Sequence, residues 1–197
     1  VALSLASILM EPPVGDRDSL SVLRPPRDEG LAPTGSYCRA LADDIARSGA
    51  AGVATGVLVG RVERSEQAWR ARTRFVERAG AWVLSDMRVG AAFPSTHRAF
   101  VGAATLRSQR VELPESLRDT ELIVALDWVD LDGFVRQWQE RFATVPRVIA
   151  VSVDDVAENA GNNSRSRFWA DAQRLHARPE AFVDAMLEQF DARSSSP

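Results

Sequence analysis

Short runs of aliphatic residues alternate with longer amphipathic segments between residues 36 and 192, and this alternation limits the possible folds more than any other feature. The aliphatic runs have no polar face, so we expect strands that are buried on both sides. A segment with helical spacing follows most of these runs, which is typical of strand–helix–strand units. The predicted strands are 53–59, 81–84, 121–126 and 148–153, and the predicted helices are 37–47, 65–79, 131–142 and 179–190.

Successive parallel strands need crossover connections, and these are right-handed in nearly all proteins. The sequence therefore predicts the α/β class, with a doubly wound, mostly parallel, Rossmann-like sheet and helices on both faces. Residues typical of helix ends support the helices. Ser36 and Ser65 are predicted N-caps, and Gly49 and Gly80 are predicted stops. Pro179 suits the first turn of the last helix.

The first 35 residues do not share this alternation. Residues 1–10 suggest a strand, and 11–35 hold five prolines without a sustained period, which is typical of a linker. We therefore expect 1–35 to be the end of a preceding domain and an inter-domain linker, 36–192 to be a central domain, and 193–197 to be a polar tail. Because the chain begins with Val1, we expect a fragment of a longer protein.

Composition excludes several functions. The sequence contains no Lys, so it has neither a Schiff-base lysine nor a phosphate-loop lysine. The net charge of -3 gives no reason to expect nucleic acid or an anionic membrane as a partner. The single cysteine, Cys38, cannot form an internal disulfide or a cysteine-based zinc site, and its helical setting favours a small buried hydrophobic residue. These features fit a cytoplasmic protein.

Three carboxylates follow the predicted strand 121–126 and give the strongest local indication of a site. Asp127, Asp130 and Asp132 would lie at the carboxyl edge of the sheet, where α/β proteins form sites, and their oxygens suit a divalent cation. The alternative is that Asp130 or Asp132 caps the next helix while the other acids are solvated. We favour this capping alternative. The pair Asp154 and Asp155 after the next strand allows the same choice.

The turn at Gly60 and Arg61 is a candidate phosphate site, because backbone N–H groups at a helix start bind phosphates. It holds one glycine where the dinucleotide motif has three, so nucleotide binding is a weak prediction. His97 and His176 lie far apart in the sequence. We expect His97 to have a packing or capping role in a loop and His176 to lie on the surface.

Six segments follow one another in a characteristic order: VALSLASILMEPPV (1–14), VLVGRVERSEQAW (57–69), RAGAWVLSDMRVGAAFPSTHRAFVG (78–102), LRDTELIVALDWVDLDGF (117–134), VIAVSVDDVAENAGNN (148–163) and Ala170-Asp171. From 57 onward they resemble the central domain of thiamine-diphosphate-dependent enzymes such as acetolactate synthase, benzoylformate decarboxylase and benzaldehyde lyase. The first is similar to the end of the preceding pyrimidine-binding domain in that family. Within 78–102, the Ala92-Phe93-Pro94, His97 and Gly102 positions match the family pattern.

The resemblance implies that this segment has no catalytic residue and holds no cofactor. The catalytic glutamate and the Gly-Asp-Gly motif for Mg²⁺ and diphosphate belong to the family's flanking domains, and Asn162-Asn163 are interpreted as turn residues. The parent enzyme is expected to use thiamine diphosphate and Mg²⁺ on 2-keto acids or related carbonyl substrates, as a homo-oligomeric lyase or transferase. The partners of this domain would be the pyrimidine- and diphosphate-binding domains.

Two other functions remain open. Some members of the family bind FAD or ADP in this domain, which here would use Gly60, Arg61 and the turn at Asp127. The Asp127 carboxylate would repel phosphate, so we do not expect this binding. A small stand-alone α/β enzyme using the acids of residues 127–132 is the third hypothesis.

Overall fold

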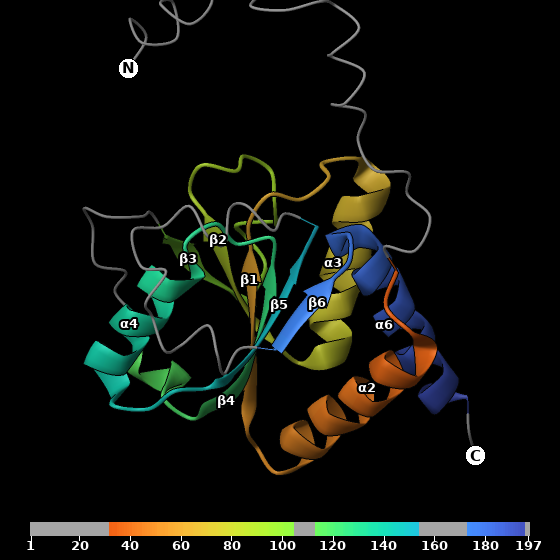
Figure 1. The fold of residues 1–197 in the computed structure, drawn as a ribbon, viewed down its shortest axis with the longest axis horizontal. Coiled ribbons are helices and arrows are strands. Elements are labelled where there is room, and N and C mark those ends of the chain that lie inside the picture. Colours follow the sequence, from red (N-terminus) through yellow and green to blue (C-terminus); the bar gives the residue numbers. More distant parts are fainter. Residues whose placement is uncertain (1–31, 105–112, 154–172, 196–197) are drawn as a thin grey trace, which may run out of the picture. The chain divides into compact units, whose positions relative to one another are not determined.

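Six strands form one parallel sheet at the centre of the fold. They are β1 (Ala54–Val59), β2 (Trp82–Asp86), β3 (Phe100–Ala104), β4 (Thr120–Leu126), β5 (Arg147–Ser152) and β6 (Gln173–His176). Their order across the sheet is β3-β2-β1-β4-β5-β6 (Figure 1). The computed structural model describes residues 32–104, 113–153 and 173–195. The predicted strand 1–10 and linker 11–35 lie almost wholly outside these residues.

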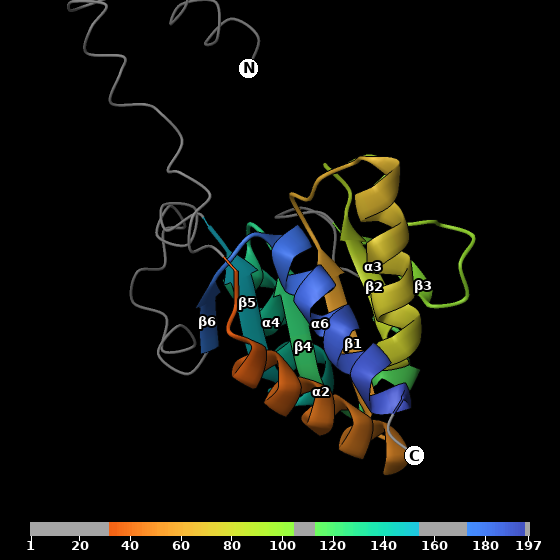
Figure 2. The ribbon, with the colours of Figure 1, turned by 90° about the vertical axis from the view of Figure 1, so that its right-hand side faces the viewer.

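Helices cover both faces of the sheet. α2 (Gly35–Ala50), α3 (Glu66–Ala79) and α6 (Pro179–Ser194) pack on one face, and Figure 2 shows them together in front of the strands. α4 (Leu131–Phe142) and the short 3₁₀ helix η2 (Glu115–Leu117) pack on the other. The predicted doubly wound α/β fold is confirmed, and every strand pair in the sheet is parallel.

Each face has its own hydrophobic core because the central strands bury side chains on both sides. Val57 and Val59 of β1 point to the core under α2, α3 and α6, whereas Leu58 points to the core under α4. Phe75 and Phe182 meet edge to face in the first core, with ring centroids 6.0 Å apart. This burial on alternate faces is the physical origin of the continuous aliphatic runs.

Most of the predicted helix ends are confirmed. The Ser65 hydroxyl accepts a hydrogen bond from the Ala68 N–H at 3.2 Å, and Gly80 ends α3 in the left-handed conformation with φ 59°. Pro179 is the first residue of α6. The ends of α2 were predicted wrongly: the helix begins at Gly35 after Thr34 as N-cap and continues through Gly49 to Ala50.

Two strands and the last turn of α6 were also not predicted. β3 contains Gly102 and is largely half-buried, and β6 is the polar sequence Gln-Arg-Leu-His, so neither forms an apolar run. Both are edge strands that pair on one side only, and an edge strand needs little apolar burial. α6 continues to Ser194, beyond the predicted end at residue 190, and Arg193 forms an ion pair with Asp43 of α2.

Candidate functional site

The strand order reverses between β1 and β4, and in open α/β sheets ligands bind beside the carboxyl ends of strands at such a point. In this chain the two turns at that point are hydrogen-bonded to each other. The Gly60 N–H donates to the Leu126 carbonyl at 2.9 Å, and the Arg61 N–H donates to the Asp127 carbonyl at 3.0 Å. The backbone donors that a phosphate would use therefore have protein acceptors.

Gly60 is required by this close approach of two backbones. A Cβ built at Gly60 would lie 2.1 Å from the Asp127 carbonyl oxygen, well inside any allowed contact. The sequence suggested a phosphate loop at this glycine, but in the structure the absence of a side chain lets two turns of the protein come together.

Asp127 connects three strands at this edge. Its Oδ1 accepts hydrogen bonds from the Ser152 hydroxyl at 2.6 Å and from Arg61 Nη2 at 3.0 Å. Its backbone N–H donates to the Val151 carbonyl at 2.8 Å, and its φ of 49° is unusual for a residue other than glycine. One carboxylate thus joins residues at or just after the ends of β1, β4 and β5.

The other two acids of the predicted cluster have separate roles. Asp130 Oδ1 accepts from the Gly133 N–H at 3.0 Å and caps α4, which confirms the capping alternative. The expectation that the remaining acids are solvated is wrong: Asp132 is buried and lies 3.4 Å from Arg136 Nε, and Asp127 is partly buried. Within the described ranges, no three His, Cys, Asp or Glu side chains group as metal ligands.

An ion pair that the sequence analysis missed ends β2. Asp86 is 2% exposed, and its Oδ1 accepts from both the backbone N–H and Nε of Arg88 at 2.9 Å, while Nη2 of Arg88 reaches Oδ2. Burial alone would raise the pKa of Asp86, but the hydrogen bonds and charge of Arg88 outweigh it and hold this pKa below its usual value. The Asp-x-Arg pattern of residues 86–88, which follows an apolar run, could have indicated this ion pair from the sequence.

Replacing Arg88 by Met should give a pH-dependent loss of stability. The folded-state pKa of Asp86 lies below its ordinary value of 3.8, so its ionic contribution is complete above that value and is lost as the pH falls through the folded pKa. We expect Arg88→Met to lower the free energy of unfolding by about 1–3 kcal/mol at pH 7. The loss should shrink as the pH falls below 3.8 and through the folded pKa of Asp86, because protonation removes the ionic interaction.

Urea denaturation between pH 7 and pH 3 measures this effect. Arg70→Met is the matched control because Arg70 is exposed and forms an ion pair with Glu66 along its own helix, so its loss should stay within about 0.5 kcal/mol. A loss at Arg88→Met that does not change with pH would show that the ion pair with Asp86 is not its cause.

The remaining predicted residues have structural positions. His97 packs edge to face on Phe93, its Nδ1 accepts from the Ala99 N–H at 3.2 Å, and it lies beside Glu77, so the packing prediction is confirmed. His176 is exposed at the end of β6. The buried position of Cys38 confirms its predicted role, and burial raises the pKa of its thiol. Asp154-Asp155, Asn162-Asn163 and Ala170-Asp171 lie outside the described residues.

Comparison with solved structures shows the fold. Benzoylformate decarboxylase from Polynucleobacter necessarius matches 91% of this chain with 19% identity and a TM-score of 0.56. A Mycobacterium smegmatis protein assigned to the thiamin diphosphate-dependent enzymes matches 82% with 17% identity and a TM-score of 0.50. AgrE (a C264A mutant with L-arginine bound) matches 93% with 10% identity and a TM-score of 0.53.

The matched region is a small part of each of these proteins. This chain spans 30% of the benzoylformate decarboxylase, 28% of the mycobacterial protein and 34% of AgrE. The same fold thus occurs as one part of longer thiamine-diphosphate-dependent enzymes.

No protein-family model and no curated protein matches the sequence. Among the described helices, none combines the length and apolar character needed to cross a membrane.

Proposed function

We propose that this chain is the non-catalytic central domain of a thiamine-diphosphate- and Mg²⁺-dependent enzyme, where its role is structural. The parent enzyme would be a cytoplasmic, homo-oligomeric lyase or transferase acting on 2-keto acids or related carbonyl compounds. The partners of the domain would be the pyrimidine- and diphosphate-binding domains of the same enzyme. The similarity of fold to two enzymes of this kind, each about three times longer than the chain, supports this assignment.

The closed edge between β1 and β4 is the observation on which the structural role rests. A nucleotide at this point would need the N–H groups of Gly60 and Arg61, but these donate to the carbonyls of the turn after β4. The Asp127 carboxylate lies at the same place and would repel phosphate. Opening the site would cost both backbone hydrogen bonds and the contacts of Asp127.

The arrangement of the three aspartates after β4 supports a cofactor site outside this chain. Magnesium is bound through carboxylates and phosphates, and here Asp127, Asp130 and Asp132 each bind a different protein group. Thiamine diphosphate and Mg²⁺ would then be held by the flanking domains of the parent enzyme.

Calorimetric titration of the purified chain with thiamine diphosphate plus Mg²⁺, then with FAD and with ADP, tests the proposal. We expect no saturable heat from any of the three. Micromolar binding of FAD or ADP would replace the structural role with a nucleotide-binding role. Binding of thiamine diphosphate would overturn the central-domain assignment itself.

A pair of arginine variants identifies the site if a nucleotide does bind. Arg61→Met removes the cation beside the β1–β4 edge, whereas Arg64→Met removes an exposed cation from the same turn. Loss of ADP binding in Arg61→Met alone would show that the edge opens in solution. Equal binding by both variants would exclude the β1–β4 edge as the nucleotide site.

A further inference from the structure

Arg72 lies on the buried face of α3, where the other residues are apolar. The buried face of this helix consists of Ala68, Arg72, Phe75, Val76 and Ala79, which follow the helical spacing of a core stripe. Arg72 is only 2% exposed. A cation in such a stripe is expensive to bury, because its hydration is lost.

The hydrogen bonds of Arg72 are incomplete. Its Nε donates to the Ala92 carbonyl at 3.1 Å. Nη1 lies 3.8 Å from Glu180 Oε1, which is an ion-pair distance but too long for a hydrogen bond. Neither Nη1 nor Nη2 has a hydrogen-bond acceptor among residues 32–104, 113–153 and 173–195. Buried donors are normally hydrogen-bonded, so we expect Nη1 and Nη2 to have an acceptor other than these residues.

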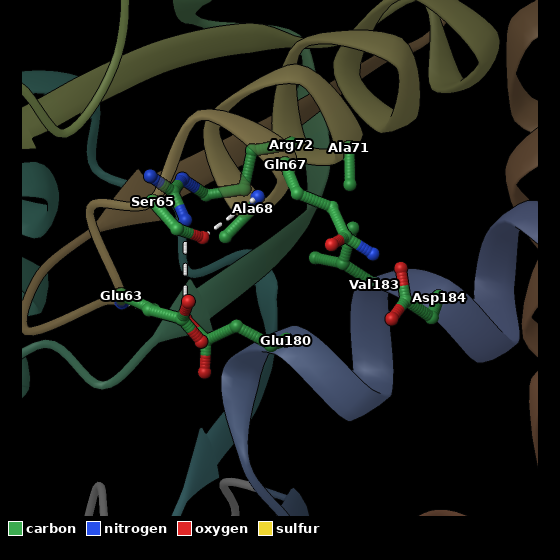
Figure 3. A pocket seen from close by; sticks show the side chains of 9 residues that line it. All are labelled: Glu63, Ser65, Gln67, Ala68, Ala71, Arg72, Glu180, Val183 and Asp184. Atoms are coloured by element: carbon green, nitrogen blue, oxygen red, sulfur yellow. Dashed lines mark hydrogen bonds and ion pairs between the residues drawn. The ribbon is translucent and has the colours of Figure 1, made fainter.

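A pocket of about 140 Å³ adjoins this guanidinium, between the first turn of α3 and the first turn of α6 (Figure 3). Arg72 and Ser65 line it from the α3 side, and Glu180 and Asp184 line it from α6. The volume is several times that needed for one water molecule, so it also admits a ligand of a few non-hydrogen atoms.

The charges around the pocket restrict the ligand. Arg72 is the one cation among the lining residues, while Glu63, Glu180 and Asp184 are anions. A simple anion would meet three like charges, and a simple cation would leave the Nη groups of Arg72 without acceptors. A small molecule carrying one carboxylate and one ammonium group satisfies both sets. The apolar side chain of Val183 also lines the pocket and suits contact with a methyl or methylene group of the ligand.

We propose that this pocket binds a small zwitterion of the α-amino acid type. Its carboxylate accepts hydrogen bonds from Nη1 and Nη2 of Arg72, and its ammonium group lies toward Glu180 and Asp184. The site is distinct from the β1–β4 edge, and the proposal does not depend on the function of the parent enzyme. The domain would then have a ligand site in addition to its structural role.

An NMR chemical-shift titration of the whole 197-residue chain with L-alanine tests the proposal. We expect saturable shifts at the first turns of α3 and α6, with a dissociation constant below about 1 mM. Arg72→Met should weaken binding at least about tenfold, because a charged hydrogen-bond donor is lost. This variant should fold, because methionine keeps the apolar stem of the side chain and Glu180, the ion-pair partner of Arg72, still accepts a hydrogen bond from the Glu63 N–H.

Three comparisons complete the test. Arg70→Met changes an exposed arginine of the same helix that does not line the pocket, so it should bind L-alanine like the wild type. Asp184→Asn, at an exposed position, should weaken the binding of L-alanine but not that of acetate, because only the ammonium group is attracted by this carboxylate. The absence of saturable shifts would overturn the proposal. Unchanged binding by Arg72→Met, or acetate bound as tightly as L-alanine, would overturn it as well.

Discussion

Gly60→Ala is expected to lower the free energy of unfolding by about 3 kcal/mol or more. The new Cβ would stand 2.1 Å from the Asp127 carbonyl oxygen and 2.7 Å from its carbonyl carbon, both atoms of the main chain. Because a peptide group cannot rotate away like a flexible side chain, the turns after β1 and β4 must separate. Separation breaks the hydrogen bonds of Gly60 and Arg61 and disturbs the contacts of Asp127.

Gly49→Ala is the matched control for this substitution. Gly49 lies inside α2, and a Cβ there meets nothing within 4 Å. Alanine favours helix over glycine, so this variant should be unchanged or more stable by up to about 1 kcal/mol. Urea denaturation followed by circular dichroism measures both changes. A Gly60→Ala chain as stable as the wild type would show that the turns are not in contact in solution.

Trp138→Ala should cost about 3–5 kcal/mol, because it removes a large side chain from the centre of the second core. Trp138 is completely buried and stacks on Trp82 with ring centroids 5.9 Å apart and planes inclined by 7°. Phe134 and Phe142 contact it from the same helix. The cavity left by alanine would lie between α4 and the sheet, where these rigid neighbours limit relaxation.

The variants Trp82→Phe and Trp138→Phe distinguish the effect of lost side-chain volume from that of a lost hydrogen bond. Trp82 Nε1 donates to the buried Thr120 hydroxyl at 3.0 Å, whereas Trp138 Nε1 has no hydrogen-bond partner within the described part of the chain. Trp82→Phe should therefore be more destabilising than Trp138→Phe by about 1 kcal/mol, although the lost volume is the same. The opposite order in urea denaturation would indicate that Trp138 Nε1 is bonded in solution.

The central strands and the helices were predictable because their signals are local. Burial on both faces gives β1 its unbroken aliphatic run, and a serine hydroxyl or a left-handed glycine ends a helix regardless of what packs against it. β3 and β6 could not be found in this way. As edge strands they are stabilised by hydrogen bonds to one neighbour, which leave no periodic pattern in the sequence.

In the candidate site, too, the positions of residues were predictable from the sequence, but their contacts were not. The sequence located Gly60, Arg61 and Asp127 at the carboxyl edge correctly, because strand ends can be placed from apolar runs. It could not show that the first turn donates its N–H groups to the second, since those bonds depend on how closely β1 and β4 approach. The pairing of Asp86 with Arg88 and the incomplete hydrogen bonding of Arg72 also depend on burial that is known only once the helices are packed.

The sequence by itself thus determined the α/β class, the central strands and most helix ends, all of which follow from periodicity and local backbone chemistry. Only the tertiary structure decided the use of each polar residue. Glycine at 60 is equally suited to a phosphate loop and to a contact between two turns, and arginine at 72 is equally suited to solvent and to a pocket. Which of these occurs depends on the atoms that residues distant in sequence bring within hydrogen-bonding distance.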